Sequence, residues 1–381
     1  MQTSPLLENI LNDVATPCYI CEEALLEKNL QLLEHIQQKS GVKILLALKG
    51  FAFTPLMNLV GKYLVGCTAS GLHEAKLAKE FMGKQIHTYS PAFKDDEIDE
   101  VLDLSDYIVF NSFTQWKKFK QKALKHSSCG LRVNPETSAS PVDLYNPCAP
   151  FSRLGIVEKN FLHHELDGIE GLHFHALCEQ NLDALKDVLK SFEEKFGKYL
   201  KQMKWVNFGG GHHITREDYD VLGLIELLSD FKSRYKNLTV FLEPGEAIGW
   251  QTGTLVSTVL DIVDNGMQIA ILDTSAEAHM PDTLAMPYRA EVRNAGKSGE
   301  KPYLYRLTGN TCLAGDIMGD YSFSKPLKVG DKIIFEDMIH YTIVKNTTFN
   351  GIKLPNLGVL QKDGRFIVAR EFGYEEYRRR N

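Results

Sequence analysis

Short apolar runs recur along the chain between residues 42 and 245, and most of them are followed by a segment with helical spacing. In segments such as 114–125 and 182–196, apolar residues recur three and four positions apart, which is typical of an amphipathic helix. Eight alternations of strand and helix predict a (β/α)8 barrel of TIM type, whose parallel strands are buried on both sides. The expected strands are Val42–Lys49, Tyr63–Ser70, Gln85–Pro91, Tyr107–Ser112, Gly130–Pro135, Glu170–Leu177, Trp205–Gly211 and Thr239–Gly245.

From about Gly249 onward, the pattern changes to closely spaced strands without long helices. This change predicts an all-β domain of the β-sandwich or β-barrel-like kind, so that the fold class is α/β plus all-β. We expect residues 24–245 to form the barrel, and residues 1–23 and 246–381 to form the β domain. Its expected strands are Gly253–Asp264, Gln268–Asp273, Tyr303–Thr308, Lys332–Phe335 and Arg365–Ala369.

Composition narrows the class of protein. A chain of 381 residues, 44% of them hydrophobic, can bury one large core or two moderate ones. A net charge of −6 and scattered Lys and Arg residues argue against a nucleic-acid partner. No apolar stretch approaches the roughly 20 residues that cross a membrane. Seven cysteines, an odd number at irregular spacings and without a signal peptide, fit a reducing cytoplasm better than a disulfide framework.

Polar residues stand where several of the expected strands end. Lys49 ends the strand that begins at Val42, Glu243 ends Val240-Phe-Leu-Glu, and His175 follows Gly171-Leu-His-Phe. Three glycines, Gly209–Gly211, follow another strand and precede a helical pattern. The C-terminal ends of barrel strands carry the active site in this class of fold, so we expect these residues to share one site.

Each residue type has a chemical use and an ordinary structural explanation. Side-chain-free backbone before a helix can bind a phosphate, although triple glycines also form plain turns. A lysine in a low-dielectric site suits imine formation, although lysines also extend to the solvent. The carboxylate of Glu243 can hold a proton on a pyridine nitrogen, and the imidazole of His175 can stack on a cofactor ring. His173 and His175 share one strand face and suggest zinc as a rival, but no third ligand is evident.

These segments resemble the fold III pyridoxal-phosphate decarboxylases of basic amino acids, of which alanine racemase is a more distant barrel relative. The resemblance covers nearly the whole chain, from Thr16-Pro17 to Phe349-Asn350-Gly351. It implies pyridoxal 5'-phosphate as cofactor and a homodimer with shared active sites. The implied roles are Lys49 as the Schiff-base lysine, His175 on the ring, Gly209, Gly210 and Gly211 on the phosphate, Glu243 on the ring nitrogen, Tyr341 beside the phosphate, and Cys312 as a proton donor in the active site of the partner subunit.

The chain departs from the usual family pattern in its charges. After Glu-Pro-Gly the family usually has an arginine, and here Glu246 takes that position. Cys312-Leu-Ala-Gly-Asp316 lacks the first acid of the family motif, and the segment from Ala276 to Asp282 carries two further carboxylates. Because an unpaired carboxylate in a closed site is costly, these anions predict a substrate with positive charge.

The Glu-Pro-Gly-Glu-Ala and His-Met-Pro-Asp segments resemble the branch of the family that decarboxylates carboxyspermidine and carboxynorspermidine. The resemblance implies that Glu246 and Asp282 bind the amines of a carboxylated polyamine substrate, with Asp316 as a further candidate. Arg153, in Ser152-Arg-Leu-Gly, would contact the substrate or orient the site. The preference between the two triamines stays open, because they differ by one methylene group.

Three alternatives remain at this point. A diaminopimelate decarboxylase would need a cation where Glu246 stands. A non-catalytic pyridoxal-phosphate homeostasis protein would resemble the barrel alone, without the β domain that carries Cys312. A metal-dependent barrel hydrolase would bind zinc through histidines, for which the candidates are His173, His175, His212 and His213.

Overall fold

The computed structural model describes residues 5–140, 142–286 and 288–381. The chain forms two compact units. The barrel unit consists of Lys28–Gly50 and Leu56–Ile248, and the sheet unit consists of the residues up to Glu27, Phe51–Pro55 and Gly249–Asn381.

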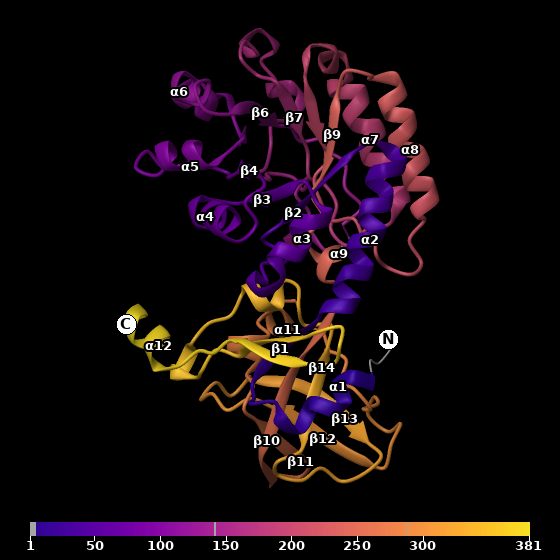
Figure 1. Ribbon diagram of the computed structural model, residues 1–381, viewed down its shortest axis with the longest axis vertical. Helices are drawn as coiled ribbons and strands as arrows, with labels where there is room; N and C mark the ends of the chain where they lie inside the picture. Colours follow the sequence, from indigo (N-terminus) through magenta and orange to yellow (C-terminus); the bar gives the residue numbers. More distant parts are fainter. Residues whose placement is uncertain (1–4, 141, 287) are drawn as a thin grey trace. The chain divides into compact units, whose positions relative to one another are not determined.

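Eight parallel strands close the barrel in chain order, from β2 to β9 (Figure 1). Strands β2 and β9 pair through Lys43 with Phe241 and Ile44 with Leu242, which closes the ring. All eight strands that the apolar runs predicted are present, so the predicted barrel is confirmed. Their bounds are β2 Lys43–Ala47, β3 Gly66–Ala69, β4 Gln85–Tyr89, β5 Tyr107–Phe110, β6 Ser128–Arg132, β7 Gly171–His173, β8 Trp205–Asn207 and β9 Thr239–Leu242.

Helices surround these strands, as Figure 1 shows for α4 to α8. Their amphipathic pattern explains the arrangement: α7 buries one apolar face, and the side chains of Ser112 and Asp220 cap the first turns of α6 and α8. The bounds are α2 Glu23–Ser40, α3 Met57–Tyr63, α4 Leu72–Phe81, α5 Ile98–Leu104, α6 Phe113–Ala123, α7 Leu182–Phe196, α8 Val221–Arg234 and α9 Glu246–Gly249.

Large side chains fill the barrel interior below its C-terminal end. Trp205, the first residue of β8, is 2% exposed and packs with Leu45, Val109 and Phe241. A Cβ atom at Gly171 would lie 2.1 Å from the Trp205 ring, so only glycine fits there. This packing fills the interior, where the ring of His87 from the middle of β4 also stacks on Tyr107 and meets the ring of Phe241 edge-on.

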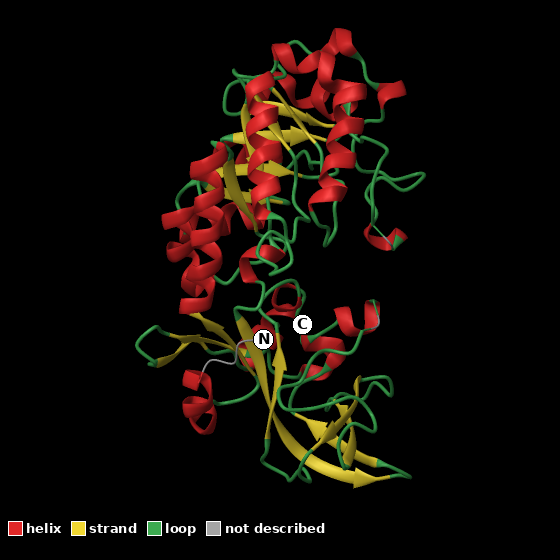
Figure 2. Ribbon diagram, turned by 90° about the vertical axis from the view of Figure 1, so that its right-hand side faces the viewer, coloured by secondary structure: helices red, strands yellow, loops and turns green. Residues whose placement is uncertain are grey.

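The sheet unit contains one mixed sheet in the order β13-β12-β11-β10-β1-β15-β16, with β14 paired to β10. Figure 2 shows that it consists largely of strands, in yellow, with short helices in red. The expected all-β domain is thus confirmed. The strands of the sheet unit are β1 Cys18–Glu22, β10 Gly253–Asp264, β11 Gln268–Leu272, β12 Tyr303–Thr308, β13 Ile317–Phe323, β14 Lys332–Glu336, β15 Asn356–Leu360 and β16 Phe366–Arg370. Its helices are α1 Pro5–Ile10, α10 Ala276–His279, α11 Asp282–Ala285 and α12 Tyr374–Arg380.

Apart from β1 in the N-terminal segment, two strands of this sheet were not among those expected, namely β13 and β15. Both contain an interior glycine, Gly319 and Gly358, and glycine weakens the intrinsic preference for a strand. They form because other strands pair with them: the preceding strand β12 pairs antiparallel with β13, and the distant β1 pairs in parallel with β15.

Candidate active site

The polar residues predicted at the strand ends meet at the C-terminal end of the barrel. Lys49 lies two residues after β2, His175 two residues after β7, and Glu243 directly after β9. Nζ of Lys49 is 3.3 Å from Nε2 of His175, and Nδ1 of His175 is 4.0 Å from Oε1 of Glu243. Residues from three separate strands therefore share one site, as expected for a barrel of this type.

Glu243 is held by two hydrogen bonds, one to each carboxylate oxygen. His173 Nε2 lies 3.1 Å from Oε1, and Asn207 Nδ2 donates to Oε2 at 3.0 Å. Burial alone would raise the pKa of Glu243, but these two hydrogen bonds and the nearby Lys49 outweigh it and lower the pKa. Burial also lowers the pKa of His173, so a neutral imidazole donates to an ionised carboxylate.

The glycine loop uses part of its backbone within the protein. The N–H of Gly209 donates to Oδ1 of Asn207 at 2.8 Å, and the N–H of Gly210 donates to Nδ1 of His175 at 2.8 Å. A Cβ atom at Gly210 would lie 2.2 Å from the carbonyl oxygen of Glu243. Two of the three N–H groups thus have partners within the protein, and the expectation that Gly209, Gly210 and Gly211 border a phosphate stays a prediction.

The hydrogen bonds of His175 determine the form of Lys49. Because Gly210 donates to Nδ1, a neutral imidazole carries its proton on Nε2 and points it at the lysine amine. Burial is the largest cause that holds the pKa of His175 well below its ordinary value, and the charge of Arg132 adds to it, so the ring is neutral. An Nε2–H donor requires an uncharged amine as its acceptor.

The electrostatic environment of Lys49 also favours the uncharged amine. Burial of the amine lowers its pKa and Arg132 adds to this, while Glu243 opposes it. The side chain still has solvent-accessible surface, so water reduces the size of the effect. The charged or titratable groups around the amine are His175, Arg132, Glu243, Cys178 and Glu74.

Lys49 is itself an exposed residue. We expect Lys49 of the cofactor-free protein to react with an acylating reagent at lower pH than the other exposed lysines of the chain. The lowered pKa increases the uncharged fraction near neutral pH, and only this fraction is nucleophilic. Labelling across a pH series, read by peptide mass spectrometry, gives the midpoint for each lysine. Glu243→Gln should lower the midpoint further, because Glu243 stabilises the charged amine. A midpoint for Lys49 equal to that of the other exposed lysines would contradict this prediction.

A second group of polar residues lies at the ends of neighbouring strands. Arg132, the last residue of β6, donates to the carbonyl of His175 at 3.0 Å and lies over the ring of Tyr89 at 4.6 Å. The Tyr89 hydroxyl donates to Oδ1 of Asn111 at 2.8 Å, and Asn111 donates to the carbonyl of Arg153. The sequence analysis did not single out Arg132, Tyr89 or Asn111. A polar residue at or just after the last position of an apolar strand is the signal that would have found them.

The two candidate substrate residues of the barrel unit differ in exposure. Glu246 begins α9; its side chain is 13% exposed, and Oε2 lies 3.4 Å from Nε2 of His213. Arg153 is exposed, and its backbone carbonyl binds Asn111. Glu246 is therefore a partly buried anion beside a histidine, whereas Arg153 is held through its main chain.

In the sheet unit, Cys312 is exposed and Asp316 is buried. The backbone N–H of Cys312 donates to Asn350 Oδ1 at 2.6 Å. The carboxylate of Asp316, whose residue is 3% exposed, accepts from the Thr311 hydroxyl at 2.6 Å and from the N–H of Ala276 at 2.7 Å. Its oxygens hold the loop that carries Cys312, and the role of Asp316 in substrate binding stays a prediction.

The remaining candidates of the sheet unit are Asp282 and Tyr341. Asp282, with a side chain 16% exposed, forms an ion pair with Lys345 at 2.6 Å, and that amine lies 5.3 Å from the centre of the Tyr341 ring. Tyr341 has φ 42° and ψ −58°, and the Thr342 N–H donates to the His340 carbonyl across it. This is a strained γ-turn, and such strain is concentrated at functional sites.

The barrel residues fit a pyridoxal-type cofactor. Lys49 offers an amine for the aldehyde, His175 a flat ring, and Glu243 an ionised acceptor with further lone pairs. Within residues 5–140, 142–286 and 288–381, no group of three or more His, Cys, Asp or Glu side chains could hold a metal ion. His173 and His175 instead contact Glu243 and Lys49.

Comparison with known proteins agrees with this chemistry. The family model for the pyridoxal-dependent decarboxylase, C-terminal sheet domain, matches residues 18–339. A carboxynorspermidine/carboxyspermidine decarboxylase of Campylobacter jejuni is 59% identical over 379 residues, with 97% of this chain and 99% of the relative covered. A carboxyaminopropylagmatine decarboxylase of Synechocystis is 45% identical, with 98% of each chain covered.

A solved structure shows the same likeness. The crystal structure of carboxynorspermidine decarboxylase from Campylobacter jejuni, complexed with norspermidine, superposes with a TM-score of 0.91 at 57% identity. The match covers 97% of this chain and 100% of that chain. The chain therefore belongs to the pyridoxal-dependent decarboxylase family, in the group that includes the carboxynorspermidine/carboxyspermidine decarboxylases.

Proposed function

We propose that this protein decarboxylates carboxynorspermidine or carboxyspermidine with pyridoxal 5'-phosphate, which yields norspermidine or spermidine in polyamine biosynthesis. The observation that carries the proposal is the 59% identity, over almost the whole of both chains, to a Campylobacter jejuni enzyme of that name. Diaminopimelate decarboxylase is the rival within the family, and it would need a cation for the distal carboxylate where Glu246 stands. A homeostasis protein limited to the barrel does not account for the sheet unit.

Bound pyridoxal phosphate supplies an electron-withdrawing ring that takes up the electron pair left when a carboxylate departs as CO2. The chain contributes binding, orientation and charge. Lys49 would hold the cofactor through its aldehyde, and His175 would hold the ring. Glu243 stays ionised and accepts the N–H of the ring nitrogen, which keeps the ring electron-poor. Gly209, Gly210 and Gly211 would border the phosphate, and Tyr341 is a further candidate to bind it.

Substrate recognition in this proposal depends on carboxylates. Glu246 is partly buried and binds one amine of the polyamine. Asp282 binds another amine. In the structure, Asp282 forms an ion pair with the amine of Lys345, a group of the same kind that a polyamine carries. Asp316 holds the Cys312 loop in place. Arg153 stays a candidate for contact with the substrate carboxylate.

Cys312 is proposed as the acid that returns a proton to the carbon that lost CO2. Its thiol lies on an exposed loop, as a group that reaches another subunit must. We therefore infer a homodimer with shared sites. All seven cysteines are free, which supports a reducing cytoplasm as the compartment. No helix within the described part of the chain has the length and apolar character to span a membrane.

The direct test is an assay of CO2 release by the purified protein with pyridoxal phosphate. Carboxynorspermidine, carboxyspermidine and meso-diaminopimelate are supplied separately and then in competition. We expect turnover of at least one triamine and none of diaminopimelate. Turnover of diaminopimelate alone would contradict the proposal.

A Cys312→Ala variant should bind the cofactor normally but release product slowly or form an aldehyde by-product, because proton return fails.

Mixing the Cys312→Ala variant with a Lys49→Ala variant tests the shared site. Random re-association puts about a quarter of all sites in the intact combination, so about a quarter of the wild-type activity should return. Two variants that stay inactive after subunit exchange would contradict the shared-site arrangement.

A further inference from the structure

Asn207 lies between the glycine loop and Glu243. It is the last residue of β8 and is 1% exposed. Its Oδ1 accepts from the N–H of Gly209 at 2.8 Å, and its Nδ2 donates to Oε2 of Glu243 at 3.0 Å. One amide therefore connects the loop and the carboxylate.

The orientation of this amide is determined by its two neighbours. In the flipped orientation, Nδ2 would face the N–H of Gly209 and Oδ1 would face the carboxylate of Glu243. Both contacts would then be repulsive. The N–H2 group can point only at Glu243, so Asn207 acts as a directed donor.

A main-chain hydrogen bond forms a second connection between the glycine loop and Glu243. The N–H of Glu243 donates to the carbonyl of Gly209 at 2.9 Å. Gly209 is thus tied to Glu243 on its carbonyl side directly and on its N–H side through Asn207. His173 holds the other carboxylate oxygen from β7. A displacement of the glycine loop must therefore move the carboxylate.

We propose that Asn207 is a positioning residue that couples the glycine loop to the carboxylate of Glu243, so that binding of the phosphate end and of the ring nitrogen of the cofactor are energetically linked. The inference rests on the proposed function, because it requires Glu243 to accept the ring N–H and the glycine loop to border the phosphate. Asn207 itself makes no contact with the reacting atoms.

Asn207→Asp is the sharpest variant. The aspartate keeps an acceptor for the Gly209 N–H but sets a second carboxylate against Oε2 of Glu243. Asn134→Asp is the matched control. Asn134 is 4% exposed, follows β6, and accepts from the N–H of Glu136 two residues later at 2.8 Å, as Asn207 does from Gly209. Its Nδ2 faces the carbonyl of Leu154 at 3.3 Å rather than a carboxylate.

The readouts are the Kd for pyridoxal phosphate, the Kd for pyridoxal without phosphate, and the pH dependence of the bound chromophore. We expect Asn207→Asp to raise the Kd for pyridoxal phosphate about tenfold or more, since it turns a buried hydrogen bond into repulsion. The Kd for pyridoxal divided by the Kd for pyridoxal phosphate should fall, because the phosphate contributes less to binding once the link is broken. Like charges favour a shared proton, so the chromophore transition should move to higher pH. Asn134→Asp sets a carboxylate against the carbonyls of Pro147 and Leu154 and should lower thermal stability. Its Kd values should stay within about twofold of the wild type, because the Asn134 amide does not contact Glu243.

Further variants separate the possible failures. Asn207→Asp combined with Glu243→Gln restores one amide beside one carboxylate, and it should recover thermal stability without recovering the pH profile. Asn207→Ser, which is uncharged, replaces Asn207→Asp if that variant does not fold, and it should show a smaller loss in the same direction.

Wild-type Kd values and pH profile in the Asn207 variants would overturn the coupling. Equal effects in Asn134→Asp would also overturn it, since they would reflect general damage to the barrel. Glu243→Gln identifies a failure of the underlying site: if it leaves the chromophore unchanged, Glu243 does not meet the ring, and both the proposed site and the coupling fall. If Glu243→Gln changes the chromophore but Asn207→Asp leaves the Kd values and the pH profile unchanged, only the coupling is refuted.

Discussion

A Lys49→Ala variant is expected to lose decarboxylation by about a thousandfold or more, because it removes the amine that we propose to bond the cofactor aldehyde. The amine of Lys49 lies 3.3 Å from His175, in the group that also includes the ionised Glu243. Borohydride reduction of the wild-type protein, followed by peptide mapping, should locate the cofactor on Lys49. The variant should bind the cofactor only reversibly.

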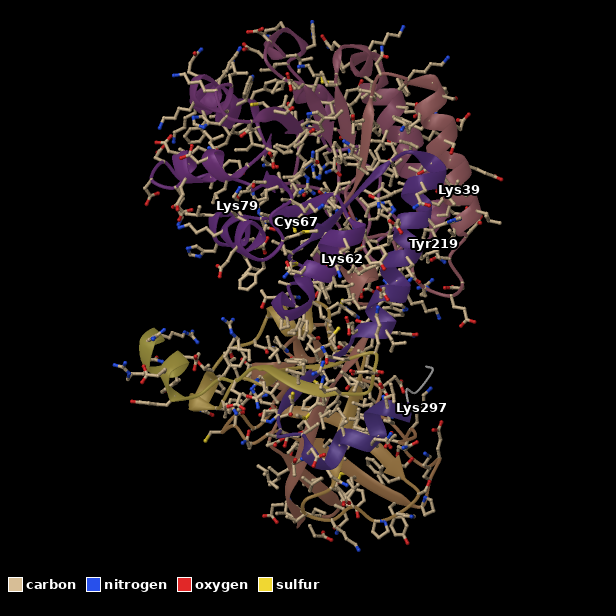
Figure 3. All side chains as sticks on the ribbon, viewed as in Figure 1. Lys39, Lys62, Cys67, Lys79, Tyr219 and Lys297 are labelled. Carbon is tan, nitrogen blue, oxygen red and sulfur yellow. The ribbon has the colours of Figure 1, made fainter. Side chains whose placement is uncertain are left out.

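The matched control for this variant is Lys62→Ala. Lys62 is exposed on α3 in the same unit (Figure 3), so its loss should leave activity and cofactor content unchanged. If the reduced label maps to another lysine, or if Lys49→Ala retains covalent cofactor, the assignment of Lys49 is wrong.

A Glu246→Gln variant is expected to weaken use of the triamine substrate through KM. Its carboxylate is 13% exposed, so a bound amine would be largely removed from water. Removing one partner of a buried, hydrogen-bonded charge pair costs about 2 kcal/mol or more, which is roughly 30-fold in KM. The value of kcat should change much less, because Glu246 does not contact the reacting carbon. Steady-state kinetics with carboxynorspermidine measure both.

Two further variants sharpen this test. Glu226→Gln, on the exposed surface of α8, removes the same charge from the protein without touching the site and should leave KM unchanged. Glu246→Arg restores the cation that the wider family carries at this position. It should abolish binding of the triamine by repulsion, and cofactor content should be retained. An unchanged KM in Glu246→Gln would remove Glu246 from the substrate site.

The sequence predicted the barrel well because buried parallel strands leave a local signal. Each of the eight apolar runs is continuous and about as long as a strand, and the helices between them have a clear period. The same local signal located Lys49, His175 and Glu243, since a polar residue that ends such a run must lie at the C-terminal end of the barrel. In the sheet unit, β13 and β15 carry no comparable pattern: β13 depends on pairing with β12, and β15 depends on β1, which lies far away in the chain.

What the sequence by itself determined is therefore the order of the strands, the end of the barrel where the chemistry lies, and the residue types gathered there. Only the tertiary structure decided how those residues use their hydrogen-bonding groups. It joined Asn207 to Glu243, engaged the N–H groups of Gly209 and Gly210, and buried Asp316 under the Cys312 loop. The physical reason is that strand and helix periods depend on neighbours in sequence, whereas the partner of a donor or acceptor depends on which distant strands the closed barrel and the sheet bring together.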